Sequence, residues 1–484
     1  MSDEASSPTD DLRDRVEALV QRALGPGWAV DEVQRLSGGA SQETYRVAAT
    51  EEGTARRLAF RRAAGGAERN PESPHPGLEV EAQLFRAAKS AGVPVPEVYA
   101  VCSPEDGLGP GFLMEWLDGE TLGPRIVRSP DFETVRPRLA HQCGEILGRI
   151  HAIDTAAHGL EQVLRTTLPE QFVRDTWENY RRISRDANGV LAFPQPMIDY
   201  TALWLLDHLP EVDSPLLVHN DFRNGNLMVD PERGVVAVLD WEIAHLGDPM
   251  RDLGWICCNS WRFGGPLPVG GFGTRDQLFD GYEETTGTRP DPDHVLFWEV
   301  FGSFWWAVGT LGMAHQYRVG PDRTVERPAI GRRTSECQMD CVNLLFPGEH
   351  GAEVPEPEAV ELADRIDLLT SVRDFLKGDV MGSTKGRTAF LARVAANSLD
   401  IVRRELAAGE TPLVQESTSL AAMGFPPQPG DDLRRQLQSQ RRALVVAMER
   451  GELELSDPGL QEHFRRVVAQ QLAIDQPRYS ALRH

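Results

Sequence analysis

The residues best suited to chemistry lie between Leu216 and Trp255, in the segment LLVHNDFRNGNLMVDPERGVVAVLDWEIAHLGDPMRDLGW. Asp221 follows an apolar run, Asn226 stands five residues after it, and Asp240 ends a second apolar run. Phosphoryl transfer needs a carboxylate that orients and deprotonates the attacking hydroxyl, together with hard oxygen ligands for the Mg²⁺ on the nucleotide phosphates. We therefore expect Asp221 to act as the base, and Asn226 and Asp240 to act as metal ligands.

His219 completes the spacing H-x-D-x-x-x-x-N, which is typical of kinase catalytic loops. In such loops the imidazole more often braces the backbone than transfers protons, and a zinc site would need further His or Cys partners that the motif does not provide. Asp and Asn are also common turn formers, so the spacing alone is compatible with a plain turn. The strand that delivers Asp240 favours the catalytic interpretation.

Taken together, the motifs HNDFRNGN, VLDWE and GDPMRDLGW resemble the aminoglycoside phosphotransferase-like enzymes, a branch of the protein-kinase-like fold that phosphorylates small molecules. The resemblance covers residues 28–345 and is closest to the kinase-like domain at the N-terminus of certain acyl-CoA dehydrogenase fusion proteins. Asn220 stands where that group usually has glycine. The family pattern implies that Asp248 and Asp252 cap a helix and brace the catalytic loop.

The resemblance implies a nucleotide-binding loop between the first two strands, where the sequence reads SGGAS. Small residues let backbone N–H groups approach phosphate closely, although a plain hairpin turn would explain the same glycine pair. The expected phosphate-binding residues of this loop are Ser37, Gly38, Gly39 and Ser41.

The resemblance also implies a cation on the third strand that pairs the α- and β-phosphates and is held by a carboxylate from the next helix. Most members use Lys, whereas this chain has Arg61, and Glu81 is the best partner, with Glu79 as a second option. Arg and Lys differ in geometry, so the effect on activity is left open. The alternative is a solvated surface pair.

A further segment, FLMEWL at residues 112–117, resembles the hinge between kinase lobes, where backbone amides bind the adenine edge. We expect Met114 and Trp116 to take part in nucleotide binding there. A buried edge strand is the structural alternative.

Composition excludes several classes of protein. The 484 residues include 73 acidic and 50 basic side chains, and the net charge of −23 argues against duplex nucleic acid as a main partner. Residues 1–15 lack the features of a signal peptide, and the apolar run over 300–314 is too short to span a bilayer, so no membrane partner is expected. Six cysteines without a CxxC pair favour a cytoplasmic protein, and Cys337 and Cys341 would form only half of a metal site.

The elements that must position the site form an α+β protein. Period-two segments and one helix over residues 77–91 predict a small antiparallel sheet in the first ~120 residues, followed by mainly helical structure. The predicted fold is therefore a protein-kinase-like bilobal fold with an all-α C-terminal domain. Its expected parts are an N-terminal tail and helix (1–27), the N-lobe (28–117), the C-lobe with the catalytic loop (118–346), a linker (347–358) and the helical C-terminal domain (359–484).

The predicted function is an ATP-dependent, or GTP-dependent, O-phosphotransferase that uses Mg²⁺ and phosphorylates a hydroxyl of a small molecule. A catalytically silent nucleotide-binding scaffold or sensor of the same fold is the alternative that Arg61 keeps open. The acceptor is either aminoglycoside-like, which suits the net charge, or acyl or acyl-CoA-like, which suits the closest resemblance. Trp261, Trp305 and Trp306 could line its site or belong to the core.

The C-terminal helices resemble an uncharacterised helical domain often adjacent to such kinases. They could cover the acceptor cleft or mediate a homodimer. Arg393 and Asn397 lie one helical turn apart in this region, so they could present a polar pair to a ligand or simply cap a helical bundle.

Overall fold

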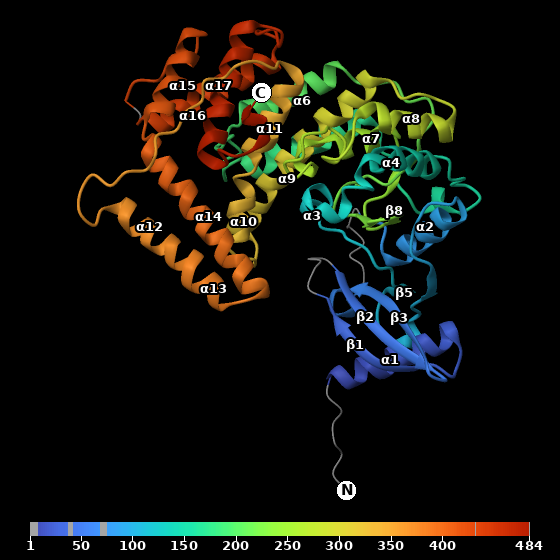
Figure 1. Cartoon of the computed structure of the whole chain (residues 1–484). Helices are drawn as coiled ribbons and strands as arrows, with labels where there is room; N and C mark the ends of the chain where they lie inside the picture. Colours follow the sequence, from blue (N-terminus) through green and yellow to red (C-terminus); the bar gives the residue numbers. More distant parts are fainter. Residues whose placement is uncertain (1–7, 37–41, 68–74, 431, 484) are drawn as a thin grey trace. The chain divides into compact units, whose positions relative to one another are not determined.

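The chain folds into two compact units whose segments alternate along the sequence. The computed structural model describes residues 8–36, 42–67, 75–430 and 432–483, and Figure 1 labels its elements. The first unit comprises Met1–Leu168, Val212–Cys257 and Trp261–Val295, and the second comprises Pro169–Glu211, Cys258–Ser260 and Leu296–His484. Every residue predicted to take part in catalysis or nucleotide binding belongs to the first unit. The domain limits expected from the sequence stay a prediction.

The N-terminal part of the first unit is a five-stranded antiparallel sheet with the strand order β1-β2-β3-β5-β4. Its strands are β1 (Ala29–Arg35), β2 (Gln42–Glu51), β3 (Thr54–Ala63), β4 (Val98–Val101) and β5 (Gly111–Glu115). The predicted small antiparallel sheet is therefore confirmed. The short strand β4 was not predicted, because four residues are too few to show a period of two.

A helix covers each face of this sheet. The two helices are α1 (Pro8–Leu24) and α2 (Leu78–Ser90). Successive side chains of a strand point to opposite faces, so Leu113 of β5 packs in one core with Leu19 of α1, while its neighbour Phe112 packs in the other with Phe85 of α2. The rings of Phe85 and Phe112 lie 5.8 Å apart between centroids.

Short strands and helices make up the rest of the first unit. They are α3 (Gly123–Arg128), α4 (Arg136–His151), β6 (Leu216–Val218), β7 (Leu227–Asp230), β8 (Gly234–Val238), β9 (His245–Gly247), α7 (Met250–Cys257) and α8 (Arg275–Thr286). β6 pairs with β9 and β7 pairs with β8, both antiparallel. Helices α4 and α8 approach closely because Gly144 faces α8; a Cβ there would lie 2.1 Å from the carbonyl oxygen of Leu278. The catalytic segment thus runs from β6 to β7.

The second unit is mainly helical. Its helices are α5 (Pro169–Ser184), α6 (Pro196–Asp207), α9 (Pro292–Val319, which begins in the first unit), α10 (Glu326–Gly331), α11 (Thr334–Leu345), α12 (Arg365–Phe375), α13 (Met381–Ser383), α14 (Gly386–Ala408), α15 (Thr411–Ala422), α16 (Leu433–Glu449) and α17 (Pro458–Asp475). The apolar run over 300–314 lies inside α9, as expected of a buried helix. In the described part of the chain, no helix combines the length and the apolar character needed to cross a membrane.

Helix α12 begins later than the apolar spacing of residues 359–377 predicts. Ala363 has φ +59°, in the left-handed region that a right-handed helix does not contain. The Asp364 carboxylate then caps the helix by accepting hydrogen bonds from the backbone N–H groups of Ile366 (2.8 Å) and Asp367 (3.1 Å). The capping aspartate therefore sets the start at Arg365.

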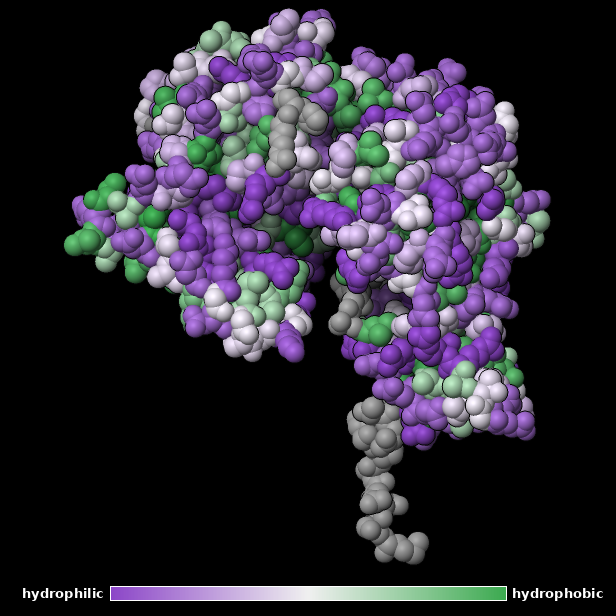
Figure 2. Space-filling model, in the orientation of Figure 1, coloured by the Kyte–Doolittle hydropathy of each residue, from purple (hydrophilic) through white to green (hydrophobic). Residues whose placement is uncertain are grey.

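Hydrophobic side chains reach the surface around α12. Leu368, Val372 and Phe375 are exposed, and their spacing places them along one side of the helix. Val360 and Leu362, in the segment before α12, are also exposed, and Figure 2 shows hydrophobic colour gathered over this part of the second unit. Contiguous apolar surface of this kind is typical of protein contact sites.

Candidate active site

Asp221 lies in the loop between β6 and β7, and three donors hold its carboxylate. Its Oδ1 accepts hydrogen bonds from Nε of Arg223 and from Nε1 of Trp255, both at 2.8 Å. Its Oδ2 accepts a hydrogen bond from Nδ2 of Asn226 at 2.5 Å. The side chain keeps 14% of its surface exposed. The carboxylate is thus fixed in orientation yet open to solvent, as a general base must be.

Asp252 of α7 braces the backbone of the same loop. Its carboxylate accepts the backbone N–H groups of His219 (2.8 Å) and Asn220 (2.7 Å), and Nε2 of His151 lies 3.2 Å away. Burial opposes its ionisation, but the hydrogen bond and charge of His151 and the bond from His219 hold the pKa of Asp252 below its usual value. The bracing role predicted for Asp252 is confirmed.

The helix cap predicted for Asp248 is confirmed as well. Its Oδ1 accepts a hydrogen bond from the backbone N–H of Met250, the first residue of α7. Asp248 therefore stabilises the start of α7, and Asp252 connects α7 to the loop that carries Asp221.

His219 is a buried neutral imidazole that ties the loop to the end of β8. Its Nδ1 accepts the backbone N–H of Asp221 (3.2 Å), and its Nε2–H donates to the carbonyl oxygen of Leu239 (3.1 Å). Burial lowers its pKa, although Asp252 and Asp221 oppose this shift. Bracing, as expected, is what this imidazole does.

Asn220 has φ +68°, in the left-handed region that favours glycine and that Asn tolerates better than most residues. This geometry accounts for an asparagine at a position where the related group usually has glycine. The side chain adds two contacts that glycine lacks, because its Oδ1 accepts from Nε of Arg251 (3.1 Å) and its Nδ2 donates to the carbonyl oxygen of Ile243 (3.3 Å).

Arg61 joins elements that are far apart in the sequence. From β3, its Nη1 lies 3.0 Å from Oε1 of Glu81 on α2, and its Nη2 donates to Oδ1 of Asp240, after β8, at 2.7 Å. Glu81 is 1% exposed and Arg61 14%, so this is a buried ion pair rather than a solvated surface pair. The structure thus brings the predicted cation and its predicted carboxylate together, beside a predicted metal ligand.

Negative charge exceeds positive charge around this cluster. Burial raises the pKa of Glu81 to about 7, with Arg61 opposing the shift. Burial and the neighbouring carboxylate of Asp240 also raise the pKa of Glu242. With Asp221, these are four carboxylates facing two guanidinium groups, those of Arg61 and Arg223.

Such a surplus fits a divalent cation. Hard cations such as Mg²⁺ prefer carboxylate and amide oxygens, and Asp240 and Asn226 supply one of each. Because Nδ2 of Asn226 is engaged with Asp221, the amide oxygen is the atom that remains for ligation.

Four residues of the cluster were not predicted: Gln42, Arg223, Glu242 and Trp255. Arg223, Glu242 and Trp255 stand inside HNDFRNGN, VLDWE and DLGW. The motifs therefore pointed to these positions, but they did not show which residues the side chains contact. Gln42 had no signal. It is the first described residue of β2, where it donates to Oε2 of Glu242 (3.0 Å) and accepts a hydrogen bond from Nε of Arg61.

The predicted hinge residues lie at the end of β5. Met114 is buried and pairs with Ala59 of β3, whereas Trp116 follows the strand and donates from Nε1 to Asp118 at 3.0 Å. Farther along, Glu120 exchanges two backbone hydrogen bonds of 2.9 Å with Val229 of β7. The segment therefore connects the sheet to the part that carries the catalytic loop, and its role toward adenine stays a prediction. Ser37, Gly38, Gly39 and Ser41 lie outside the described residues.

Trp261 is the predicted aromatic residue that lies beside the base. The guanidinium of Arg223 stacks over its ring at 4.2 Å, and the ring packs against Trp255 at 5.0 Å. Cys337 and Cys341 are buried thiols in α11. Among the described residues, the group of acidic and histidine side chains close enough together to hold a metal is His141, Glu145 and Glu284, which includes neither cysteine.

Comparison with known proteins agrees with this geometry. Residues 32–289 match the phosphotransferase enzyme family (APH), and residues 382–479 match a domain of unknown function (DUF6285). The second match confirms the prediction of an uncharacterised helical domain.

Two relatives are acyl-CoA dehydrogenase family members of Mus musculus. Member 10 is 32% identical over 188 residues, which cover 37% of this chain and 16% of that protein. Member 11 is 28% identical over 344 residues, which cover 65% of this chain and 42% of that protein. The chain thus spans less than half the length of these relatives.

Among solved structures, a putative aminoglycoside phosphotransferase from Ralstonia eutropha matches with a TM-score of 0.54 and 22% identity. The match covers 68% of this chain and 96% of that chain. It shows a shared fold, and the predicted kinase-like fold is confirmed.

Proposed function

Because the chain belongs to the phosphotransferase enzyme family over residues 32–289, we propose that it transfers the γ-phosphoryl group of ATP or GTP to a hydroxyl of a small molecule. The observation that carries this proposal is the cluster in which Arg61 contacts both Glu81 and Asp240, while three donors fix Asp221. Phosphoryl transfer depends mainly on positioning and on charge stabilisation, which such a cluster can supply.

In the proposed reaction, Asp221 accepts the proton of the acceptor hydroxyl as its oxygen attacks the γ-phosphorus. The bond from the γ-phosphorus to the bridging oxygen breaks, and ADP or GDP leaves. The hydrogen bonds from Arg223, Trp255 and Asn226 keep the carboxylate from rotating, so little orientational freedom is lost when the acceptor binds.

Asn226 and Asp240 would hold Mg²⁺, which would neutralise charge on the nucleotide phosphates. Arg61 would contact the phosphates with the remaining N–H donors of its guanidinium, while Glu81 keeps the side chain in place. A planar guanidinium can bind a carboxylate and a phosphate at once, which supports a working role for arginine at this position.

For the acceptor, we propose a hydroxylated acyl or acyl-CoA-like molecule as the first class to test, because the curated relatives carry the name acyl-CoA dehydrogenase. That name belongs to proteins of which this chain matches a minor part, so aminoglycosides form the second class. The distinguishing feature is charge, since an aminoglycoside is polycationic and an acyl-CoA is polyanionic.

The test compares the full chain with Asp221→Ala and with Asp213→Ala, an exposed aspartate of the same unit that serves as control. Each protein is incubated with γ-labelled ATP or GTP, Mg²⁺ and panels of hydroxylated acyl compounds and aminoglycosides. We expect label transfer by the full chain and the control, and none by Asp221→Ala, which should still bind nucleotide in a thermal-shift assay. An Asp221→Ala protein that transfers phosphate at the normal rate would contradict the proposal.

The alternative is a nucleotide-binding scaffold without turnover. It predicts Mg²⁺-dependent nucleotide binding by the full chain with no transfer to either panel, and no difference between the two variants. The contacts of Arg61 favour an enzyme over a scaffold, because this arginine contacts Glu81 and Asp240, the carboxylates expected near the phosphates.

A further inference from the structure

The second unit contains a cavity in which arginine side chains gather. The cavity, of about 560 Å³, is lined by residues of α10, α11 and α14 and by the segment that follows α17. Its lining includes Arg332, Arg333, Arg404 and Arg478, and we call it the arginine groove. Asn397 of α14, noted in the sequence as one of a polar pair, lines it as well.

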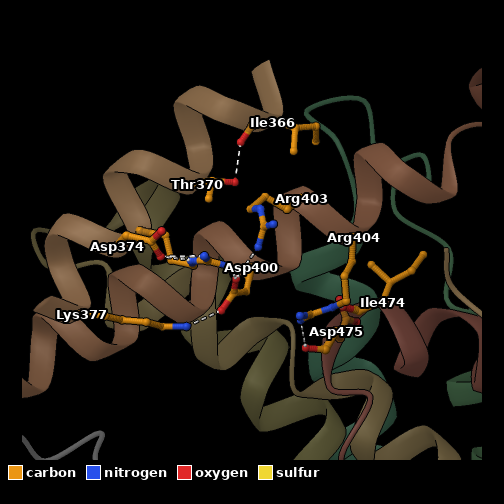
Figure 3. A network of polar contacts seen from close by, with 10 residues as sticks. Ile366, Thr370, Asp374, Lys377, Asp400, Arg403, Arg404, Ile474 and Asp475 are labelled. Carbon is orange, nitrogen blue, oxygen red and sulfur yellow. Dashed lines mark hydrogen bonds and ion pairs between the residues drawn. The ribbon is translucent and has the colours of Figure 1, made fainter. Parts of the chain in front are cut away.

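Carboxylates in and around the groove are already paired with cations. Asp475 is held by Arg332 at 2.6 Å, and Glu336 is held by Arg333 at 3.0 Å. Asp400 is shared by three cations, Arg373 (3.1 Å), Lys377 (2.8 Å) and Arg403 (3.0 Å), in the network of Figure 3. Each of these carboxylates therefore has its ion pair with a residue other than Arg404 or Arg478.

Arg404 and Arg478 are the lining arginines that stand outside these ion pairs. Arg404 donates from Nε to the carbonyl oxygen of Ile474 (2.6 Å) and from Nη2 to that of Asp475 (3.1 Å), both at the end of α17 (Figure 3). Within the described ranges, neither Arg404 nor Arg478 forms an ion pair, and Arg478 forms no hydrogen bond either. Neither guanidinium group therefore has a carboxylate at ion-pair distance in this part of the chain.

These two arginines are close enough to repel each other. Burial lowers the pKa of Arg404, and the charges of Arg403 and Arg478 act in the same direction, against Asp400 and Asp475. A purely structural role, in which Arg404 caps the C-terminus of α17, explains its carbonyl contacts. That role does not explain Arg478, which forms no hydrogen bond or ion pair with any described residue.

Apolar side chains form a smaller part of the wall. Ile330 of α10, Phe390, Val394 and Ile401 of α14, and Pro477 line the groove beside the charged residues. The volume of the cavity is that of small-molecule sites. Residues 382–479 also carry 13 basic and 12 acidic side chains, so the acidic surplus of the chain lies elsewhere.

We propose that the arginine groove binds a small molecule that carries a phosphate or carboxylate group on an apolar body. Arg404 and Arg478 bind the anionic group, and the side chains of Phe390 and Ile401 contact the apolar body. Guanidinium groups suit both anions, because they present two parallel N–H donors.

The experiment uses the full chain with two probes, octyl phosphate and octanoate, each below its micelle concentration, in titration calorimetry. We expect saturable binding of at least one probe, and their relative affinities identify the preferred anion. Inorganic phosphate should bind at least about tenfold more weakly than octyl phosphate, because it cannot bury apolar surface. Raising the salt concentration should weaken all three.

Arg478→Gln is the decisive variant, because this exposed side chain has no partner among the described residues and its loss should leave folding intact. It should weaken probe binding by about tenfold or more. Arg434→Gln, which removes an exposed arginine of α16 away from the groove, is the matched control and should bind normally. Arg61→Gln, in the first unit, should also bind normally.

Four results would overturn the proposal. Three are the absence of saturable binding of both probes, equal binding by Arg478→Gln and the full chain, and an equal loss in Arg434→Gln. The fourth is a loss of binding in Arg61→Gln, which would place the probes at the proposed nucleotide site. All of these outcomes are measurements of probe binding, so they do not depend on whether the chain has the proposed phosphotransferase activity.

Discussion

The cluster around Asp221 and the arginine groove differ in how their charges are paired. In the cluster, four carboxylates face two guanidinium groups. In the groove, Asp475, Glu336 and Asp400 are each paired, and Arg404 and Arg478 form no ion pair within the described ranges. The net charge of −23 therefore says little about either ligand. A site selects its ligand by the charge that its own folding leaves unpaired.

The two sites also differ in how tightly their charges are held. Around Asp221, several predicted side chains are fixed by partners from other elements, as when Arg61 spans Glu81 and Asp240. In the groove, Arg404 is fixed through carbonyl groups, and Arg478 has no hydrogen bond or ion pair in the part of the chain that the structure describes. Preorganised donors are typical of sites that stabilise a transition state, whereas an adaptable site needs only to bind. This difference can be tested from both sides.

The largest effect is expected from removing a carboxylate of the cluster around Asp221. Asp240→Ala should lower kcat for phosphoryl transfer by about a thousandfold or more, because the proposed metal ligand and a contact of Arg61 are lost together. Steady-state kinetics with Mg²⁺ and nucleotide measures it, with Asp213→Ala as the exposed control. A loss of less than about tenfold would mean that Asp240 does not take part in the reaction.

The bracing carboxylate should matter for stability rather than for binding. Asp252→Asn keeps one acceptor oxygen but turns an NH₂ group toward a backbone N–H, of His219 or Asn220, that needs an acceptor. We expect the free energy of unfolding of the first unit to fall by about 3 kcal/mol. Hydrogen exchange of amides in α4 and α7 measures this, with Asp213→Asn as the control. A change below about 1 kcal/mol would mean that water or another acceptor takes over.

How much of this the sequence predicts differs sharply between the two sites. The cluster around Asp221 draws its proposed base, its proposed metal ligands and its brace from one segment, where fixed spacings such as Asp221 to Asn226 translate directly into contacts. Glu81 was also predicted to meet Arg61, because a family pattern fixes which helix follows which strand. Gln42 was not, since its contacts with Arg61 and Glu242 depend on how β2 and β3 pair.

The arginine groove could not be predicted in this way. Its residues come from α10, α11, α14 and the end of the chain, and a basic residue on an amphipathic helix is usually a solvated one. What distinguishes Arg478 from Arg434 is that it lines the cavity, which depends on tertiary packing. Asn397 was singled out in the sequence, but only the packed helices show that it lines a cavity.

Two buried aspartates, one in each unit, have opposite pKa shifts. The pKa of Asp252 in the first unit is lowered, whereas that of Asp199 in the second unit is raised. Burial raises the pKa of Asp199 to about 6 from its ordinary 3.8, although Trp177 donates a hydrogen bond at 2.8 Å. Since the folded pKa exceeds the unfolded one, the folded state holds the proton more tightly. The resulting stability is present below about pH 4 and is lost as the pH rises through about 6.

The difference in unfolding free energy between the full chain and Asp199→Asn should therefore fall by up to about 3 kcal/mol between pH 4 and pH 7. Denaturant unfolding of the second unit, followed by hydrogen exchange in α5 and α6, measures this difference. Asp207→Asn, an exposed aspartate at the end of α6, is the control and should show no such trend. Parallel pH profiles for the full chain and Asp199→Asn would show that Asp199 is ionised in the folded protein.

The smallest expected effect compares arginine with lysine at both sites. At Arg61, lysine keeps the charge but loses the fork that reaches Glu81, Asp240 and Gln42 together, so Arg61→Lys should lower kcat/KM for the nucleotide by about tenfold. At Arg478 no such geometry exists, so Arg478→Lys should leave probe binding within about threefold. Kinetics with varied nucleotide and calorimetry with octyl phosphate measure the two. Equal losses at both positions would contradict the proposed distinction. Activity at the cluster around Asp221 would then depend on side-chain geometry no more than binding in the arginine groove does.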